Sequence, residues 1–165
     1  MTPTSTRTFY EYTYWSCELV WDCIQELTDE QFTQPIDYSI GSIRNHVVHM
    51  MSGTHRWMMR LQDNPLPPHL AFEDFTSIDA TKTVWNAMKA DVLAYVYSLD
   101  QGQLDEVIQW EIGTRDILRQ HPRWALLMHI ANHATDHRSQ ILALLHHHFG
   151  VRTVEHDMVF YLAQH

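Results

Sequence analysis

The stretch from Pro122 to Gly150 constrains the fold most, because its two ends suit the two ends of one long helix. Proline fits the first turn of a helix, where its missing N–H group costs nothing, and glycine can end a helix in the left-handed conformation. Between them, apolar residues recur at helical spacing, at Leu126, Ile130, Ala134, Ile141, Leu144 and Leu145. The pattern predicts one amphipathic helix that packs its apolar face against the rest of the chain.

Three histidines follow the same face of this expected helix. His129, His133 and His137 are each four residues apart, and side chains at that spacing lie one above the other. Two such imidazoles can reach one metal ion. Because the chain has 13 histidines, the spacing can also arise by chance, and core-facing imidazoles held by hydrogen bonds are an alternative explanation.

A second source of histidines favours the metal site. His46 and His49 lie on or beside the apolar stripe of another expected helix, which begins near Ser39 or Ser42 as its cap and carries apolar residues as far as Leu61. Metal sites in helix bundles take ligands from facing helices. Two imidazoles from the helix at 122–150 and one from this helix would leave a fourth coordination position open, which is typical of catalytic zinc sites.

The remaining chain predicts two more long helices, and thus an all-α four-helix bundle in a single domain over residues 1–165. A long, proline-bounded crossover is expected between the second and third helices. Residues 100–121 suggest either a short hairpin turning at Gly113-Thr114 or a helical extension. The expected segments are a first helix at 7–28, the crossover at 64–77, a third helix from its cap Asp79 to Leu99, and a short C-terminal helix at 154–163.

Composition excludes several classes of function. The formal net charge is −9, and only Lys82 and Lys89 are lysines, so we expect no nucleic-acid partner. No apolar run is long enough to span a bilayer, and the N-terminus lacks the pattern of a secretion signal, which predicts no membrane partner and a cytoplasmic location. Cys17 and Cys23 point to different sides of one helix, so free thiols are expected.

The other histidines give weaker signals. His146, His147 and His148 point in three directions at a helix end, where a solvated last turn is the expected role. Five more histidines have no constellation and are expected at the surface: His55, His69, His121, His156 and His165.

Two segments together resemble the DinB/YfiT-like metalloenzyme family. Residues 129–141, HIANHATDHRSQI, are similar to its histidine-rich signature helix, and residues 41–57 are similar to its second helix, in which a histidine precedes a tryptophan by eight positions, as His49 precedes Trp57 here. The resemblance covers nearly the whole chain. It departs from the family pattern at Asp136, where histidine is frequent, and at Thr54, where an acidic residue is frequent.

The resemblance implies a four-helix bundle with a divalent metal, zinc or nickel, held by His49, His133 and His137. It also implies a metal-dependent transferase or isomerase that joins a low-molecular-weight thiol, such as bacillithiol, mycothiol or glutathione, to a small electrophile. Hydrolysis by metal-bound water is a further possibility. A family-typical homodimer is expected, and the guesses for the pocket walls are Met50, Trp57 and Trp124.

Two other functions stay open at this stage. One is a non-catalytic, metal-binding and dimerising stress-response module, and the other is a pH-sensitive histidine core without metal.

Arg138 and Gln140 are expected to connect helices through side-chain interactions, and Glu18 or Asp22 is an expected partner of Arg138.

Overall fold

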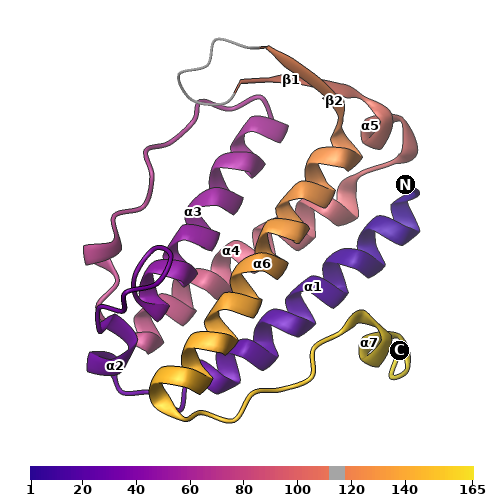
Figure 1. Cartoon of the computed structure of the whole chain (residues 1–165). Helices are drawn as coiled ribbons and strands as arrows, with labels where there is room; N and C mark the ends of the chain where they lie inside the picture. The colour runs from indigo at the N-terminus through magenta and orange to yellow at the C-terminus, as the bar shows by residue number, and fades with distance from the viewer. Residues whose placement is uncertain (112–117) are drawn as a thin grey trace.

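The computed structural model describes residues 1–111 and 118–165 and contains the predicted four-helix bundle (Figure 1). Each long helix packs against two others, in the cyclic order α1, α6, α3, α4. The prediction of an all-α bundle is therefore confirmed. Its four long helices are α1 (Pro3–Ile24), α3 (Ile43–Leu61), α4 (Ile78–Ser98) and α6 (Arg123–Phe149).

The crossover between α3 and α4 explains how these consecutive helices come to run in the same direction (Figure 1). Residues 62–77 leave the end of α3 and return along the outside of the bundle to the start of α4, with only the 3-10 turn η1 (Phe72–Asp74) on the way. Three prolines in this segment, Pro65, Pro67 and Pro68, remove backbone donors and prevent the chain from continuing as a helix. The predicted long crossover is thus confirmed.

The helix ends differ from the prediction where short polar side chains cap the backbone. Helix α1 begins four residues earlier than expected because Thr2 forms a capping box with Ser5. The prediction of Asp79 as the cap of α4 was wrong, since the Ser77 side chain accepts from the backbone N–H of Ala80, and Asp79 lies within the first turn. A short helix that the sequence analysis missed, α2 (Asp29–Thr33), starts at a capping box on Thr28.

The two ends of α6 match the sequence pattern. Pro122 precedes the first helical residue, and Gly150 ends the helix with φ of 68°, in the left-handed region that glycine enters without a steric penalty. The helix can therefore span the whole bundle without interruption, which places all of its histidines on one rigid element.

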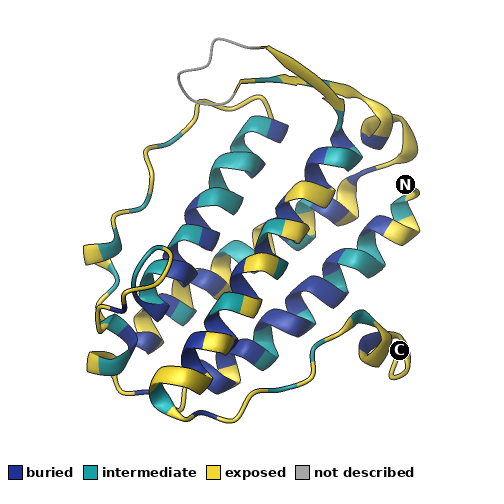
Figure 2. Cartoon of the chain, viewed as in Figure 1, coloured by how far each residue is buried: buried dark blue, intermediate teal, exposed yellow. Residues whose placement is uncertain are grey.

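The core lies between the four long helices, whose inward faces are buried (Figure 2). Trp21 of α1 and Trp85 of α4 meet edge to face with ring centroids 6.0 Å apart. The Tyr10 hydroxyl donates to the Leu127 carbonyl at 3.0 Å, which links α1 to α6. Each fully buried apolar side chain contributes about 1.5–3 kcal/mol before chain entropy is subtracted.

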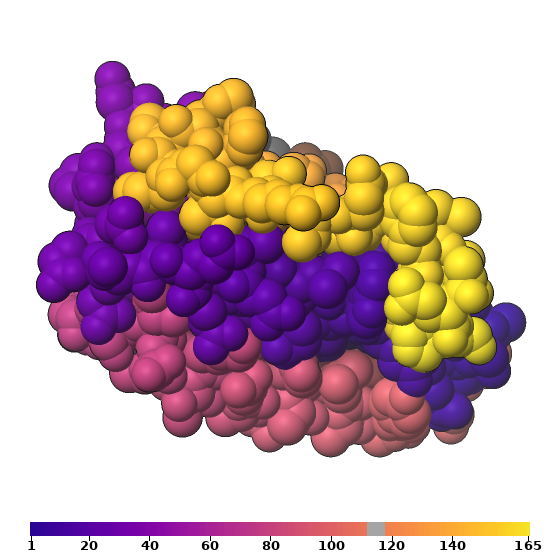
Figure 3. Space-filling view, turned by 90° about the horizontal axis from the view of Figure 1, so that it is seen from below, coloured from indigo at the N-terminus to yellow at the C-terminus, as the bar shows by residue number. Residues whose placement is uncertain are grey.

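Two peripheral units pack on the bundle, one at its end and one along α1. Beyond α4, the short helix α5 (Gln101–Asp105) leads to an antiparallel pair of strands, β1 (Val107–Trp110) and β2 (Arg119–Pro122). The hairpin alternative for residues 100–121 is therefore favoured, although the expected turn at Gly113-Thr114 lies outside the described residues. The segment after α6 passes over α1 and ends in α7 (Met158–Leu162) (Figure 3).

Three further expectations concern single residues or segments. Cys17 and Cys23 are both buried free thiols, as predicted. Arg138 is fully buried, but it contacts Cys17 and Thr135. The expected partner Glu18 instead forms ion pairs with lysines of α4.

Over residues 1–111 and 118–165, no helix has both the length and the apolar character that crossing a membrane requires.

Candidate metal centre

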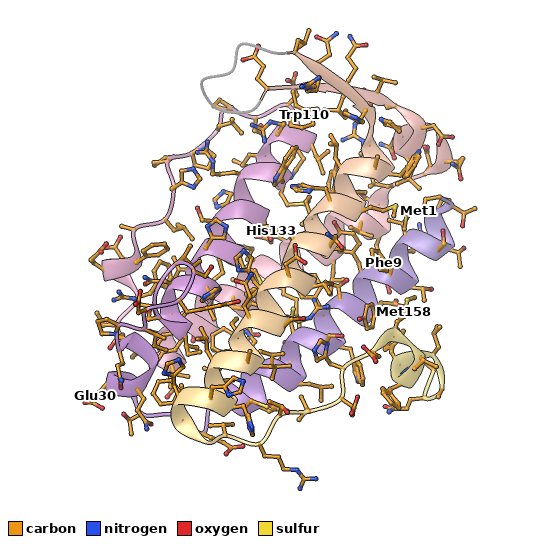
Figure 4. All side chains as sticks on the ribbon, viewed as in Figure 1. Met1, Phe9, Glu30, Trp110, His133 and Met158 are labelled. Atoms are coloured by element: carbon orange, nitrogen blue, oxygen red, sulfur yellow. The ribbon has the colours of Figure 1, made fainter. Side chains whose placement is uncertain are left out.

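The structure brings together the three histidines that the sequence analysis assigned as ligands. His49 lies on α3, and His133 and His137 lie one turn apart on α6. One nitrogen from each ring lies within 4.8 Å of the other two. In Figure 4, His133 lies at mid-height of α6 on the side facing α3. The three imidazoles therefore converge between two helices that pack directly against each other.

The distances between the ring nitrogens fit a divalent metal. His133 Nε2 lies 3.2 Å from His49 Nε2 and 3.2 Å from His137 Nε2. Three nitrogens bound at about 2.0–2.1 Å to a tetrahedral ion lie about 3.3–3.4 Å from one another. The two distances to His133 are close to that value, and no pair of the three nitrogens is more than 4.8 Å apart.

Hydrogen bonds alone satisfy this arrangement poorly. The His133 Nε2 atom faces two other ring nitrogens, and a neutral imidazole nitrogen either donates one hydrogen bond or accepts with one lone pair. A cation at the centre would accept the lone pairs of all three rings at once. The donor set thus fits a metal better than it fits a hydrogen-bonded core.

Burial favours the neutral form of the three imidazoles. It is the main cause that lowers the pKa of His133 and His137 to about 4, and the neighbouring histidines add to the effect. Burial also lowers the pKa of His49, with a further contribution from His69. Since a metal binds only the neutral imidazole, the site is ready to bind one at neutral pH without first releasing protons.

A fourth histidine contacts one ring of the three-histidine cluster. His46 of α3 is fully buried, and its Nδ1 lies 3.1 Å from His137 Nδ1. Its other nitrogen, Nε2, is buried and has no hydrogen-bond partner among the described residues. The sequence pattern indicated both His46 and His49 as candidates, and their contacts differ. The His49 Nε2 atom faces His133 Nε2 in the cluster, whereas His46 contacts the Nδ1 atom on the other edge of the His137 ring.

The remaining histidines lie outside the cluster. His129, one turn before His133, is exposed and packs its ring edge to face against Trp57, with centroids 5.1 Å apart. His69, on the crossover, interacts through Nδ1 with Ser52 Oγ at 3.1 Å. His146, His147 and His148 are exposed in the last turn of α6, as expected for a solvated helix end.

An aromatic cavity of about 270 Å³ opens beside the histidine cluster, at the hairpin end of α3 and α6. Its walls are Trp57, Trp110, His121, Ala125, Leu126 and His129. Of the three residues proposed as pocket walls, Trp57 lines this cavity. Met50 is buried in the core, and Trp124 packs against the core without lining the cavity. Trp110 and His121 were missed, because they belong to a hairpin whose direction relative to the bundle has no local sequence signal.

Comparison with protein families identifies the chain. The model of the DinB family matches residues 1–165. The chain belongs to the DinB family. A comparison with curated proteins finds no significant match. Two positions at which this DinB chain departs from the expected pattern, Thr54 and Asp136, are half-buried and exposed respectively, and neither provides an atom of the three-histidine group.

Proposed function

We propose that this protein is a divalent-metal-dependent enzyme that transfers a low-molecular-weight thiol to a small electrophile or uses that thiol in an isomerisation. His49, His133 and His137 would hold the metal, with zinc or nickel as the expected ion. The observation that carries the proposal is the convergence of three neutral imidazoles beside an aromatic cavity. Three protein ligands leave a coordination position for a reactant.

The residues of the chain and the bound ion would have different tasks. A divalent ion at this site supplies the positive charge that lowers the pKa of a thiol and keeps it as the more nucleophilic thiolate. The three imidazoles fix the position of that charge. Trp57 and Trp110, with ring centroids 5.2 Å apart, form an apolar wall against which the electrophile can lie and which excludes water from the reacting atoms.

The proposed transfer balances without an oxidant or reductant. The thiolate sulfur forms a bond to the electrophilic carbon, and the leaving group departs with the electrons of the broken bond. The proton of the thiol passes to solvent or buffer. In an isomerisation, the thiol would add to the substrate and leave again after the bond has rotated.

Metal analysis of protein purified without an affinity tag tests the site. We expect about one equivalent of metal in the wild type and a loss of that equivalent in His133→Ala. The matched control is His129→Ala, which removes the exposed histidine one turn away and should retain the metal. Absence of bound metal after incubation with zinc, nickel, copper or iron would remove both the site and the enzyme proposal.

Assays of thiol transfer then separate the enzyme from its main rival. The rival is a non-catalytic metal-binding module that pairs with a second copy, and the exposed apolar side chains of Val159, Phe160 and Leu162 favour it. Metal-dependent conjugation of glutathione, bacillithiol or mycothiol to an electrophile, abolished in His133→Ala, would support the enzyme. A metal-loaded protein that is inactive with all three thiols would support the module. The homodimer and the cytoplasmic location stay predictions.

A further inference from the structure

A second cavity, of about 440 Å³, lies next to the aromatic cavity and differs from it in charge. Trp110 lines both cavities, so the two spaces are neighbours. Figure 4 shows Trp110 beyond the end of α3 that is nearest the hairpin. The second cavity is lined by two arginines of α3, Arg56 and Arg60, and by Gln109 and Glu111 of the hairpin.

Neither arginine is neutralised by a carboxylate in the part of the chain that the structure describes. Arg56 donates to the Pro67 carbonyl of the crossover. The Arg60 guanidinium lies 4.5 Å from the Trp57 ring centroid. Glu111 lines the same cavity but forms an ion pair with neither of them.

The two cations also repel each other. They are four residues apart on one helix face, where like charges are unfavourable. Burial, and then the charge of Arg56, lowers the pKa of Arg60. The chain has a formal charge of −9 and only 11 lysines and arginines. Two of these arginines are nevertheless half-buried in the same cavity. An anion placed between them would relieve the repulsion and accept charge-assisted hydrogen bonds.

The arginines lie in line with the histidine cluster. Arg56 and Arg60 follow His49 by seven and eleven residues, which along a helix corresponds to about 10 Å and about 16 Å. Trp57 lies between them in the chain and lines the aromatic cavity. A small molecule with its reactive atom at the histidines and its apolar body on the tryptophans would therefore extend toward the arginines.

We propose that Arg56 and Arg60 bind the carboxylate of a small molecule whose apolar body lies against Trp57 and Trp110. This inference rests on the proposed function for the identity of the reaction, and it names the substrate class: a carboxylate-bearing molecule with an apolar part. The competing explanation is structural, with Arg56 tying the crossover to α3 and Arg60 covering the face of Trp57.

Binding of a matched probe pair tests the proposal. Naphthalene-2-carboxylate and its neutral amide, naphthalene-2-carboxamide, have nearly the same shape, and calorimetry measures their affinities for metal-free and zinc-loaded protein. We expect the carboxylate to bind about tenfold more tightly than the amide in both forms, as one charge-assisted pair allows. Arg56→Gln and Arg60→Gln should each remove most of that preference. The control Arg152→Gln, in an exposed segment beside the end of α1, should retain it.

The metal-free measurement separates this proposal from the proposed function. A preference that needs zinc and ignores both arginine variants would mean that the carboxylate binds the metal, and it would overturn the arginine site while leaving the metal site standing. Equal affinities for the two probes, or no binding of either, would also overturn it. A preference that persists in metal-free protein would support the arginine site even if no thiol transfer were found.

A second probe pair identifies which reactant carries the anion. Glutathione and glutathione diethyl ester have the same thiol but differ in their carboxylates. A preference for glutathione that is lost in Arg60→Gln would assign the arginines to the thiol. Equal binding of the two forms, together with a preference for naphthalene-2-carboxylate, would assign them to the electrophile. Either result supports a carboxylate site, and the absence of both preferences contradicts it.

Discussion

The Nδ1 atoms of His46 and His137 lie 3.1 Å apart inside the bundle, so one ring must donate a proton to the other. His137 turns its Nε2 toward His133. A lone pair on that Nε2 requires the proton of a neutral His137 to sit on Nδ1, and His46 Nδ1 then accepts it. The proton of His46 is left on Nε2, which is buried without a partner in the described chain. His46 therefore fixes the tautomer in which His137 can bind a metal.

We predict that His46→Phe weakens zinc binding about 10- to 100-fold, the usual effect of losing the partner of a ligand histidine. His46→Asn should recover much of the affinity, because its side-chain oxygen can accept from His137 Nδ1. Competition with a chromophoric chelator measures the affinities, and nitrogen NMR of the imidazoles reports the tautomer of His137. Equal affinities for the phenylalanine and asparagine variants would contradict the role of His46.

Gly53 should be needed for the position of His133. A Cβ atom at Gly53 would lie 3.2 Å from His133 Cε1, which is closer than ordinary contact and would push the ring by a few tenths of an ångström. We expect Gly53→Ala to weaken zinc binding about tenfold, since metal sites tolerate little displacement of a ligand. Chelator competition gives the affinity.

The stability of the same variant separates this effect from misfolding. Alanine is favoured over glycine within a helix by about 1 kcal/mol, so metal-free Gly53→Ala should be no less stable than the wild type in urea unfolding. Gly102→Ala, in α5, is the control that should leave zinc binding unchanged. Wild-type affinity in Gly53→Ala would show that the ring can move without cost to the site.

Metal-free protein should lose stability as the pH falls from about 6.5 to about 4. Burial lowers the pKa of His46, His133 and His137 to about 4, whereas an unfolded histidine has a pKa of about 6.5. Between these values the unfolded chain binds more protons, so the free energy of unfolding decreases with falling pH, by up to about 1.4 kcal/mol per pH unit for each such histidine. The decline ends once the folded rings are also protonated.

Urea unfolding of chelator-treated protein at pH 7, 5.5 and 4.5 measures this slope. His46→Phe should reduce it, because one neutral buried imidazole is removed. His147→Ala, which removes an exposed histidine, should not change it. A free energy of unfolding that stays constant over this range would contradict the burial-driven shifts.

The two buried arginines of α6 should respond differently to removal. Arg123 donates to the carbonyls of Leu61 and Gln103, to the Tyr95 hydroxyl and to Glu106. Arg123→Met would remove all four of these hydrogen bonds, although the Leu61 carbonyl would still accept from the Tyr95 hydroxyl. We therefore expect a loss of about 3 kcal/mol in the free energy of unfolding. Urea unfolding at neutral pH measures it.

Arg138→Met should cost much less. Its Nε is buried without a partner among the described residues, and its side chain donates to the Cys17 sulfur, at 3.7 Å, and to the Thr135 hydroxyl, at 2.9 Å. The guanidinium carbon also lies 5.9 Å from the Tyr12 ring centroid. A buried charge without a carboxylate contributes little net stability, so methionine should be neutral within about 1 kcal/mol or stabilising. A loss as large as that of Arg123→Met would show that Arg138 has interactions beyond these contacts.

The sequence predicted those parts of the fold that depend on local pattern. Helical spacing between Pro122 and Gly150 defined α6, and the proline-rich segment after Leu61 indicated the crossover, because both follow from backbone chemistry within a few residues. The short helix at Asp29–Thr33 and the start of α1 at Pro3 were missed, since a threonine cap is a weak signal beside apolar periodicity. The pairing of His49 with His133 came from the resemblance and not from spacing alone.

Other parts of the site depend on contacts between distant segments. Nothing near His46 in the chain indicates that its ring lies behind His137, which is 91 residues away. Trp110 and His121 are neighbours of α3 and α6 only because the hairpin folds over the end of the bundle. Nothing in the local sequence marks Arg56 and Arg60 as cavity residues, because the cavity forms only where the crossover and the hairpin meet the end of α3.

His49 and His133 are 84 residues apart in the chain, and this separation sets the order of events as the protein is made. A growing chain that has emerged from the ribosome only as far as α4 has one of the three ligands. Tight capture of an ion must wait until α6 has docked against α3. Metal uptake would then follow the docking of α6, and the rate of zinc binding during refolding would report the rate at which α6 packs against α3.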